Sequence, residues 1–522
     1  MKTFNKLFTF LTVIFLILSC TNNLDETPID SIGSQYIYSS ETGLESAVTG
    51  LYNQMRTLNY SEGTGAQILS SMLLRVATDL GHARVALDLA YNPALFSPTG
   101  PIPHEWGQLY FIVARCNGII TYGENVDMDQ TNKDILLAQA HAIRAEVYMQ
   151  LYTIYNKIVL YTEPEYPSDD YTPANPADIW ALVDNDLDFA VSKLPWDVEP
   201  GRYGQGVARH LRGISALWQE DWQEAANQFD AIVDSGMYNL VPLDQVFVGD
   251  ENHAESLYTY QTSQALAGGN ATAGGGPSCL ASMFNNRYYE ISTGEMIQAV
   301  DIGGQAFGWE FPNDYCQSLY DRVNDKRYTT YYYDQNYIVN NPNHPNFGQP
   351  LPASSIPNNF RQYHFSLKKF HDPNKPATAD VSYQNFLHYR FAEVLLLGAE
   401  AHWELSGRNS TDAKALEYIN KVRRRAYFGV PGSTDTTYDY TSINEDNYLE
   451  ESARELALEW GRYTLLKRRG LLMERVRLHF TSGSNSGNIT GRSTAPDYMQ
   501  HFPIPQSQID LMGDPSFQNP GY

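Results

Sequence analysis

The chain has 522 residues and a formal net charge of −24 at pH 7, from 60 acidic and 36 basic side chains. This charge repels phosphate backbones and anionic lipid headgroups, so it argues against nucleic acid as a partner and against a basic contact with a membrane surface. Beyond Cys20, the remaining cysteines are odd in number and lack CxxC spacing, so no disulfide framework is implied. The expected partner is therefore neutral, cationic or a protein.

The first residues predict export. Lys2 and Lys6 precede an apolar run, residues 7–18, that ends two residues before Cys20. A run of this length is typical of a signal peptide and is short of the roughly 20 residues that cross a bilayer as a helix. Because the cysteine stands where a bacterial lipobox requires it, we expect residues 1–19 to be a lipoprotein signal peptide and Cys20 to be lipidated.

Residues 20–34 are polar and acidic, which predicts a flexible tether behind the lipidated cysteine. The body then spans residues 35–522. This length, about 500 residues, exceeds the usual size of a single hydrophobic core, yet no low-complexity linker divides the chain. We therefore expect one body with subdomains.

Apolar residues at three- and four-residue steps predict long helices in the first half of the chain. The segments are 43–58, 103–122, 133–155 and 176–194. Trp106 and Trp180 fall on these helical patterns, so we expect both in the core.

Two further segments predict helical hairpins of the tetratricopeptide type, residues 208–236 and 389–425. Small or apolar residues recur in them at Gly213, Ala216, Ala225, Phe229 and Ile232, and at Gly398, Ala399, Ala415, Ile419 and Val422. Small residues let two helices approach closely, while large apolar residues fill the seam to the next hairpin. The prediction is a mainly α scaffold of stacked hairpins, with independent amphipathic helices as the alternative.

Helical periodicity fails in residues 240–383, which are rich in Gly, Asn, Pro and Tyr. Tyrosines crowd into residues 288–337. We interpret this stretch as an insert of long irregular loops with a few short strands, and functional surfaces preferentially lie on such loops. Tyrosine offers an apolar face and a hydroxyl, the combination that sugar rings and protein partners both use.

Motifs for catalysis and for metal binding are incomplete. His104 begins a sequence like a zinc-protease helix, but Gln108 stands where the second histidine belongs. Asp127 begins a calcium-loop spacing, but Ala138 holds the position of the bidentate glutamate. The sequence has no G-x-S-x-G elbow and no phosphate-binding loop. We therefore predict a binding protein with no catalytic residue, no cofactor and no metal.

Charged residues on the later helices are expected to be structural. We interpret Glu400 and Arg425 as parts of solvated helix faces or of salt bridges between hairpins. Residues 451–470 mix acidic and basic side chains, which predicts one helix that braces the helical layer. Two carboxylates flanking a cleft are enough for a glycosidase, so the 60 acidic residues do not exclude that chemistry.

Several motifs, in one order along nearly the whole chain, resemble the SusD/RagB family of nutrient-binding outer-membrane lipoproteins of Bacteroidetes. After the lipobox, the matching segments are 114–120 (ARCNGII), 140–145 (AHAIRA) with Tyr148 and Tyr152, the hairpin at 208–232, 324–327 (NDKR), 389–396 (YRFAEVLL), 455–463 (ELALEWGRY), 502–505 (FPIP) and 518–522 (QNPGY).

The resemblance implies a SusD-like fold, with tetratricopeptide-like hairpins as a scaffold and irregular loops as the ligand surface. It also implies a lipid-anchored protein on the exterior of the outer membrane, which captures an oligosaccharide and delivers it to a SusC-like TonB-dependent transporter. Glycan-binding members stack aromatic side chains on sugar rings and hydrogen-bond to hydroxyls. That task requires no catalysis.

Most of the matching motifs belong to the scaffold, so the resemblance places the ligand surface by position only. The candidates are Asp79, Arg84, Tyr91 and Asn92 in the loop at 79–96, and Tyr288, Tyr289, Phe307 and Trp309 in the tyrosine-rich insert. Trp309 is the leading candidate for a ring that stacks on a sugar.

Three alternatives remain at this point. A peptide-capturing lipoprotein of the same family would use the same scaffold. A surface glycoside hydrolase would need two carboxylates on either side of a cleft and would turn its substrate over. A pure assembly protein would use its hairpins only to dock partners, and an aromatic surface in the loops would argue against it.

Overall fold

The computed structural model describes residues 37–38, 40–59, 74–84, 90–92, 95–100, 105–164, 171–248, 252–263, 278–333, 335–357, 359, 361–480 and 492–522. The predicted signal peptide, Cys20 and the tether lie outside these residues. Within the described part of the chain, no helix combines the length and the apolar character needed to cross a membrane.

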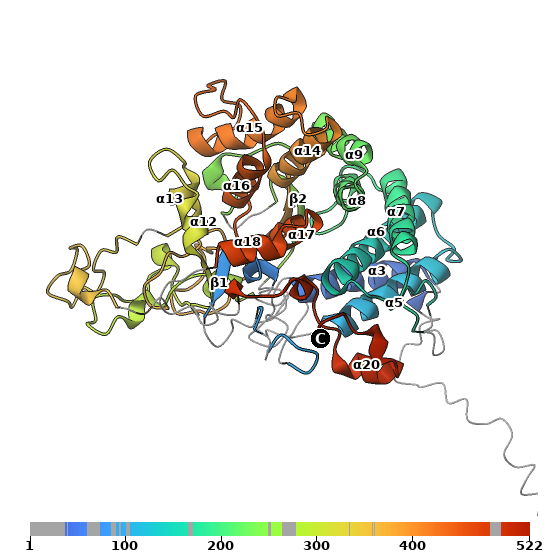
Figure 1. The fold of residues 1–522 in the computed structure, drawn as a ribbon, viewed down its shortest axis with the longest axis horizontal. Helices are drawn as coiled ribbons and strands as arrows, with labels where there is room; N and C mark the ends of the chain where they lie inside the picture. Colours follow the sequence, from blue (N-terminus) through green and yellow to red (C-terminus); the bar gives the residue numbers. More distant parts are fainter. Residues whose placement is uncertain are drawn as a thin grey trace, which may run out of the picture.

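An arc of helices forms the scaffold, and each helix packs against the next one along the chain (Figure 1). In order they are α3 (Glu41–Asn59), α5 (Trp106–Gly123), α6 (Gln130–Tyr155), α7 (Pro176–Lys193), α8 (Gln205–Trp218), α9 (Trp222–Asp234), α14 (Phe391–Leu405) and α15 (Ala413–Phe428). The predicted helices of the first half are confirmed, and both tryptophans on them are buried. The fold is mainly α, as expected.

Local sequence sets several helix ends. The side chain of Asp129 begins α6 by accepting a hydrogen bond, 3.0 Å long, from a backbone N–H three residues on. Asn175 caps α7, and Pro176 follows at its first position. Asp412 caps α15, which ends at Gly429 with a φ of +80°, a conformation that favours glycine.

The two predicted hairpins are α8–α9 and α14–α15, and glycine sets the contact between their helices. A Cβ on Gly213 would lie 2.6 Å from the ring of Phe229, and a Cβ on Gly398 would lie 2.9 Å from the ring of Tyr418. Both distances are shorter than a Cβ can tolerate, so only glycine allows these rings to pack so closely. The small residues of the sequence pattern therefore act as predicted.

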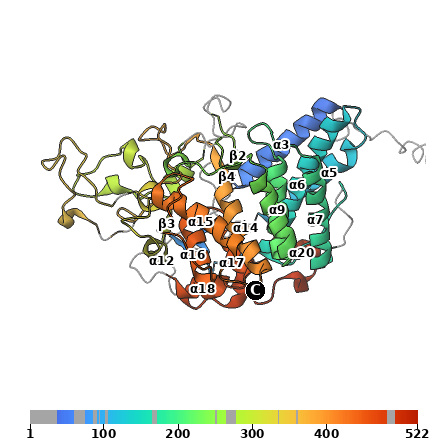
Figure 2. The same cartoon turned by 90° about the horizontal axis from the view of Figure 1, so that it is seen from above.

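The chain leaves the scaffold after α9 and returns at α14, the next helix in the arc. The predicted insert at 240–383 lies within this excursion, much of which projects from the end of the molecule opposite α3 and α5 (Figure 1, Figure 2). At its base, β2 (Ser256–Tyr260) pairs antiparallel with β4 (Phe386–Arg390). The insert therefore leaves and re-enters the scaffold through one two-stranded sheet.

The elements inside the insert are short. They are the 3₁₀ helices η2 (Leu243–Gln245), η3 (Tyr288–Glu290), η4 (Val300–Ile302) and η5 (Ala353–Ser355), the helices α11 (Leu280–Met283), α12 (Asp314–Ser318) and α13 (Arg327–Tyr331), and the strand β3 (Glu310–Pro312). β3 pairs antiparallel with β1 (Gly81–Ala83), which connects the insert to the loop predicted at 79–96.

The C-terminal part packs beside the arc as short helices. They are α16 (Glu445–Glu455), α17 (Arg462–Arg468), α18 (Leu472–Leu478), η6 (Asp497–Gln500), α20 (Gln506–Met512) and η7 (Pro515–Phe517). The single helix predicted over 451–470 is wrong, because Leu458 and Gly461 have positive φ and interrupt it. At the break, Lys369 Nζ donates to the carbonyls of Glu455 (2.7 Å) and Ala457 (3.2 Å). A buried cation thus satisfies carbonyls that a continuing helix would have used.

A buried ionic network joins these parts. Its pairs are Arg390 with Glu255, Glu455 and Glu459; Arg425 with Glu255 and Glu455; Arg327 with Asp325, Glu451 and Glu455; and Lys369 with Glu459. The network contains residues of the insert, of β4, of α15 and of α16, together with the residue just before β2 and one in the turn after α16.

Arg425 and Glu400 are fully buried, so the interpretation of solvated faces is wrong for both. Glu400 pairs with Arg468 and Arg469 at 2.6 Å each, across to the C-terminal helices.

We expect Glu455→Gln to lower the free energy of unfolding by about 3–5 kcal/mol, because it leaves buried guanidinium groups undercompensated. Glu417→Gln is the matched control, since Glu417 pairs with Lys421 on the exposed side of α15 at 2.8 Å. Its effect should be at most about 0.5 kcal/mol. Urea titrations of both variants measure the difference, and equal effects would contradict a structural role for the network.

Stability should also fall in acid. Burial alone would raise the pKa of Glu400, but Arg468 and Arg469 outweigh it and lower the pKa from 4.5 to about 2. A carboxyl whose pKa is depressed by folding stabilises the protein above its unfolded pKa, and this contribution is lost as pH falls towards the folded pKa. We expect a loss on the order of 3 kcal/mol from this group between about pH 5 and pH 2.

Glu400→Gln tests this assignment. The variant should be less stable at pH 7, and its free energy of unfolding should depend less steeply on pH between about 5 and 2 than that of the parent protein. Chemical denaturation at a series of pH values measures both slopes. Parallel slopes would show that another carboxyl accounts for the acid sensitivity.

Candidate ligand-binding surface

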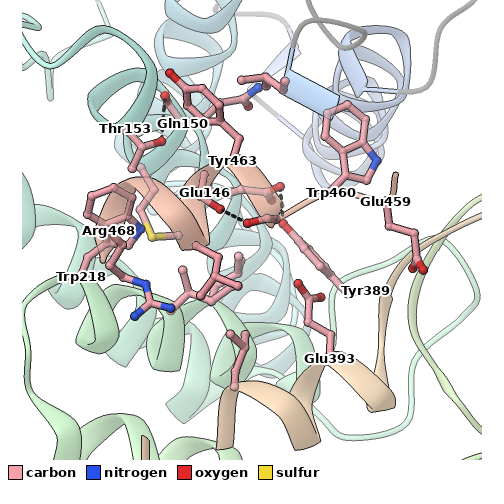
Figure 3. Close-up of a pocket in the computed structure, with 18 of the residues that line it drawn as sticks. Glu146, Gln150, Thr153, Trp218, Tyr389, Glu393, Glu459, Trp460, Tyr463 and Arg468 are labelled. Carbon is pink, nitrogen blue, oxygen red and sulfur yellow. Dashed lines mark hydrogen bonds between the residues drawn. The ribbon is translucent and has the colours of Figure 1, made fainter. Parts of the chain in front are cut away.

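A cavity of about 170 Å³ lies between α6, α8, α14 and α17 (Figure 3). Its wall mixes the rings of Trp218, Trp460 and Tyr463 with the carboxylates of Glu146 and Glu459. Ligand clefts usually measure about 300–1,000 Å³. The cavity is too small for an oligosaccharide, and its lining does not include the side chains predicted to bind one.

Two of the three carboxylates that line this cavity, those of Glu146 and Glu459, are already engaged, and the third, that of Glu393, lies 3.3 Å from His210. Glu146 accepts hydrogen bonds from the hydroxyls of Tyr203 and Tyr389, the latter at 2.8 Å, and its burial raises its pKa. Burial also acts to raise the pKa of Glu459, but Arg390 and Lys369 outweigh it and lower that pKa. Opposite shifts are typical of an acid and base pair. Here, however, tyrosine hydroxyls and buried cations occupy the oxygens, so the cavity does not offer the two available carboxylates that a glycosidase requires.

Asp79, a predicted ligand residue, lies in the interior with only 1% of its surface exposed. Its carboxylate pairs with Arg462 at 2.6 Å and Arg475 at 3.3 Å. Burial opposes ionisation, but the two arginines prevail and lower the pKa of Asp79. The carboxylate connects the loop before β1 to α17 and α18, and it has no surface to offer a ligand.

Two predicted tyrosines are also interior. Tyr91 is buried and donates to the carbonyl of Ala77 at 2.8 Å. Tyr288 is fully buried, and its hydroxyl accepts from the N–H of Ala299 at 3.0 Å. Asn92 is half-buried, and its carbonyl accepts from two backbone N–H groups in the following turn. The rings of Tyr91 and Tyr288 therefore lie in the packed interior, whereas the assignment of Asn92 to the ligand surface stays a prediction.

Three of the other predicted ligand residues, Arg84, Phe307 and Trp309, lie together at the end of the β1–β3 pair. The backbone N–H of Arg84, just after β1, donates to the carbonyl of Trp309, just before β3, at 2.9 Å. The Arg84 guanidinium carbon lies 5.9 Å from the centre of the Trp309 ring. Phe307 stacks on Trp309 with 4.5 Å between ring centres and 25° between ring planes. All three side chains are half-buried, so part of each remains accessible to solvent.

Tyr289 borders the same segment. Its hydroxyl donates to the carbonyl of Ala306 at 3.0 Å and accepts from the N–H of Ala306 at 3.3 Å. The ring is half-buried, like those of Phe307 and Trp309. We refer to Tyr289, Phe307 and Trp309 as the aromatic cluster.

Two arginines that the sequence did not single out lie against the aromatic cluster. Arg361 donates from Nε to the carbonyl of Phe307 at 3.0 Å. The Arg287 guanidinium carbon lies 5.9 Å from the centre of the Tyr289 ring, and the side chain pairs with Glu290 at 2.5 Å. Arg287 stands next to the predicted tyrosines and could have been noticed for that reason. Arg361 is recognised only through the fold, because it lies 54 residues from its partner.

Comparison with known proteins gives one family. A model of the SusD family matches residues 245–522, which is more than half of the chain. The match includes the aromatic cluster, the base of the insert and the C-terminal helices. The N-terminal helices of the arc lie before it.

Relatives and solved structures extend the likeness to nearly the whole chain. SusD-like protein P2 of Formosa agariphila is 23% identical over 88% of this chain and 90% of its own length. A SusD homologue from Bacteroides thetaiotaomicron superposes with a TM-score of 0.74 at 19% identity, covering 94% of this chain and 98% of its own. Surface glycan-binding protein A from the same species, solved in complex with laminarihexaose, gives a TM-score of 0.69 at 18% identity over 92% and 99%.

Proposed function

The chain belongs to the SusD family, and on that premise we propose that it is a cell-surface glycan-binding protein, which captures an oligosaccharide without cleaving it. The observation that carries the proposal is the half-buried stack of Phe307 and Trp309 at the surface of the insert, bordered by Tyr289. Partly exposed aromatic rings suit the apolar face of a sugar ring. A structural neighbour of the same fold binds laminarihexaose, which supports a sugar as the ligand.

The proposal includes an anchor and a partner. Cys20 would hold the protein on the exterior of the outer membrane through a lipid, as the lipobox-like sequence indicates. The helical arc would dock on a SusC-like TonB-dependent transporter, to which the captured glycan passes. The long, ordered arc offers a rigid surface for a protein partner, while the insert keeps its aromatic cluster for the ligand.

Trp309→Ala tests the binding surface. The protein from Thr21 onward is screened on an array of glycans and peptides, and its affinity for each hit is measured by calorimetry. Loss of the Trp309 ring should weaken glycan binding by about 1–3 kcal/mol, the scale of one aromatic contact that is buried on binding.

The matched control is Phe111→Ala, which removes an exposed ring on α5 that also lies beside an arginine, Arg115, at 4.0 Å. Its affinity should equal that of the parent. Unchanged affinity in Trp309→Ala would refute the surface but not the family. Product analysis on each hit completes the test, because cleavage of the glycan would favour a hydrolase, and hits confined to peptides would favour peptide capture.

The anchor has its own test. In cells supplied with labelled palmitate, the parent protein should incorporate the label and Cys20→Ala should not, because the acylated residue is missing. Cys116→Ala is the control, since Cys116 is buried in α5 and has no role in acylation. Labelled Cys20→Ala protein would refute the proposed anchor.

A further inference from the structure

Three arginines surround the aromatic cluster of a strongly acidic chain. Arg84 lies over Trp309, Arg361 bonds to the carbonyl of Phe307, and Arg287 lies over Tyr289. All three side chains are half-buried around the short segment from Ala306 to Trp309. Three positive charges are thus concentrated within one part of the surface.

Two of these arginines differ from the buried arginines elsewhere. Arg75 and Arg144, for example, each pair with a carboxylate at less than 3 Å, as buried charges normally do. Among the described residues, neither Arg84 nor Arg361 has an ion-pair partner, and the buried Nε of Arg84 has no hydrogen-bond acceptor. Within the described part of the chain, Arg287 is the one of the three that forms an ion pair, with Glu290.

Burial and mutual repulsion act on the charges of these arginines. Burial lowers the pKa of Arg84, and the nearby charge of Arg287 lowers it further. Burial has the same effect on Arg361, with Arg287 and Arg84 as the next causes, and the carboxylate of Glu290 acts in the opposite direction. That carboxylate already pairs with Arg287, and among the described residues Arg84 has no carboxylate partner. Guanidinium groups that repel one another in this way are typical of a site that binds an anion. The planar donor pattern of arginine suits carboxylate and sulfate groups in particular.

We propose that Arg84 and Arg361, with Arg287 beside them, bind the carboxylate or sulfate group of a charged glycan whose ring stacks on Trp309. This inference rests on the proposed function and names its ligand class. The charge of −24 led to the opposite expectation, a neutral or cationic partner. At physiological ionic strength, however, exposed charges are screened beyond roughly 8–10 Å, so the arginines next to the ligand determine its binding.

The test compares three probes on the same protein: an oligogalacturonate, which carries carboxylates; a carrageenan oligosaccharide, which carries sulfates; and laminarihexaose, which is neutral. Calorimetry at low and at high NaCl should show that at least one charged probe binds more tightly than the neutral one and loses affinity as salt increases. The two charged probes distinguish carboxylate from sulfate recognition.

Arg84→Gln and Arg361→Gln should each weaken binding of the charged probe about tenfold, the effect of losing a hydrogen bond to an ionised group. Arg84→Lys keeps the charge and should weaken binding less. The matched control, Arg115→Gln, removes an arginine that also lies over an aromatic ring, on α5, and should bind like the parent. Arg84→Gln removes no ion pair within the described residues and should unfold at about the temperature of the parent. Arg361→Gln also loses the hydrogen bond to the carbonyl of Phe307 and should unfold at a slightly lower temperature.

The outcomes separate the two proposals. Tighter binding of laminarihexaose than of either charged probe, or charged-probe affinity that neither salt nor the glutamine variants change, would overturn the anionic ligand and leave glycan binding in place. The salt series on the parent protein decides the same question if a variant does not fold. If no glycan on the array or among the three probes binds the parent protein, the proposed function fails and the ligand class fails with it.

Discussion

The buried carboxylate of Glu455 is the interaction on which the architecture depends. It contacts Arg327 of the insert, Arg390 at the end of β4 and Arg425 of α15, and all four side chains are almost fully buried. Removing ions from water costs several kcal/mol each, and the attraction between them offsets that cost only when the whole set is assembled. Four parts of the chain therefore depend on one another for their stability, although long stretches of sequence separate them: the insert, the sheet at its base, the helical arc and α16.

This dependence explains how an irregular insert can hold a binding surface. β3 follows Trp309 directly. The carboxylate of its Glu310 accepts two hydrogen bonds from Arg75, one from Nη2 at 2.9 Å and one from Nε at 3.0 Å. β1 lies opposite β3 and brings Arg84 to the same place. The rings are thus held by buried polar contacts rather than by regular secondary structure. Ligand binding then requires little ordering of the protein, which is the usual route to useful affinity from a small contact area.

Sequence reasoning succeeded where the determining contacts are local or periodic. Helical spacing predicts the scaffold helices. Gly213 and Gly398 indicate the hairpins because a small residue on a helix face allows the ring of the next helix to approach closely. It failed where a side chain's environment depends on a distant partner. The sequence gives no sign that Asp79 is buried, because its partner Arg462 lies 383 positions away, and no sign of Arg361, because its contact with Phe307 exists only in the fold. The sequence of residues 451–470 predicts one helix, and the break in it also depends on a distant partner. Lys369, which donates to the carbonyls at the break, belongs to the insert.

Net charge misleads about the ligand for a related physical reason. A sum over the chain counts a paired arginine and an unpaired one equally, yet a paired arginine such as Arg390 contributes little field at the surface. Many of the buried acidic groups here pair with buried arginines or lysines, and salt screens the charges of those described acidic side chains that are exposed. Under the proposed function, the charges next to a ligand at Trp309 are those of Arg84 and Arg361, neither of which forms an ion pair among the described residues. An acidic protein can therefore present a positive binding surface where the fold places such arginines beside an exposed ring.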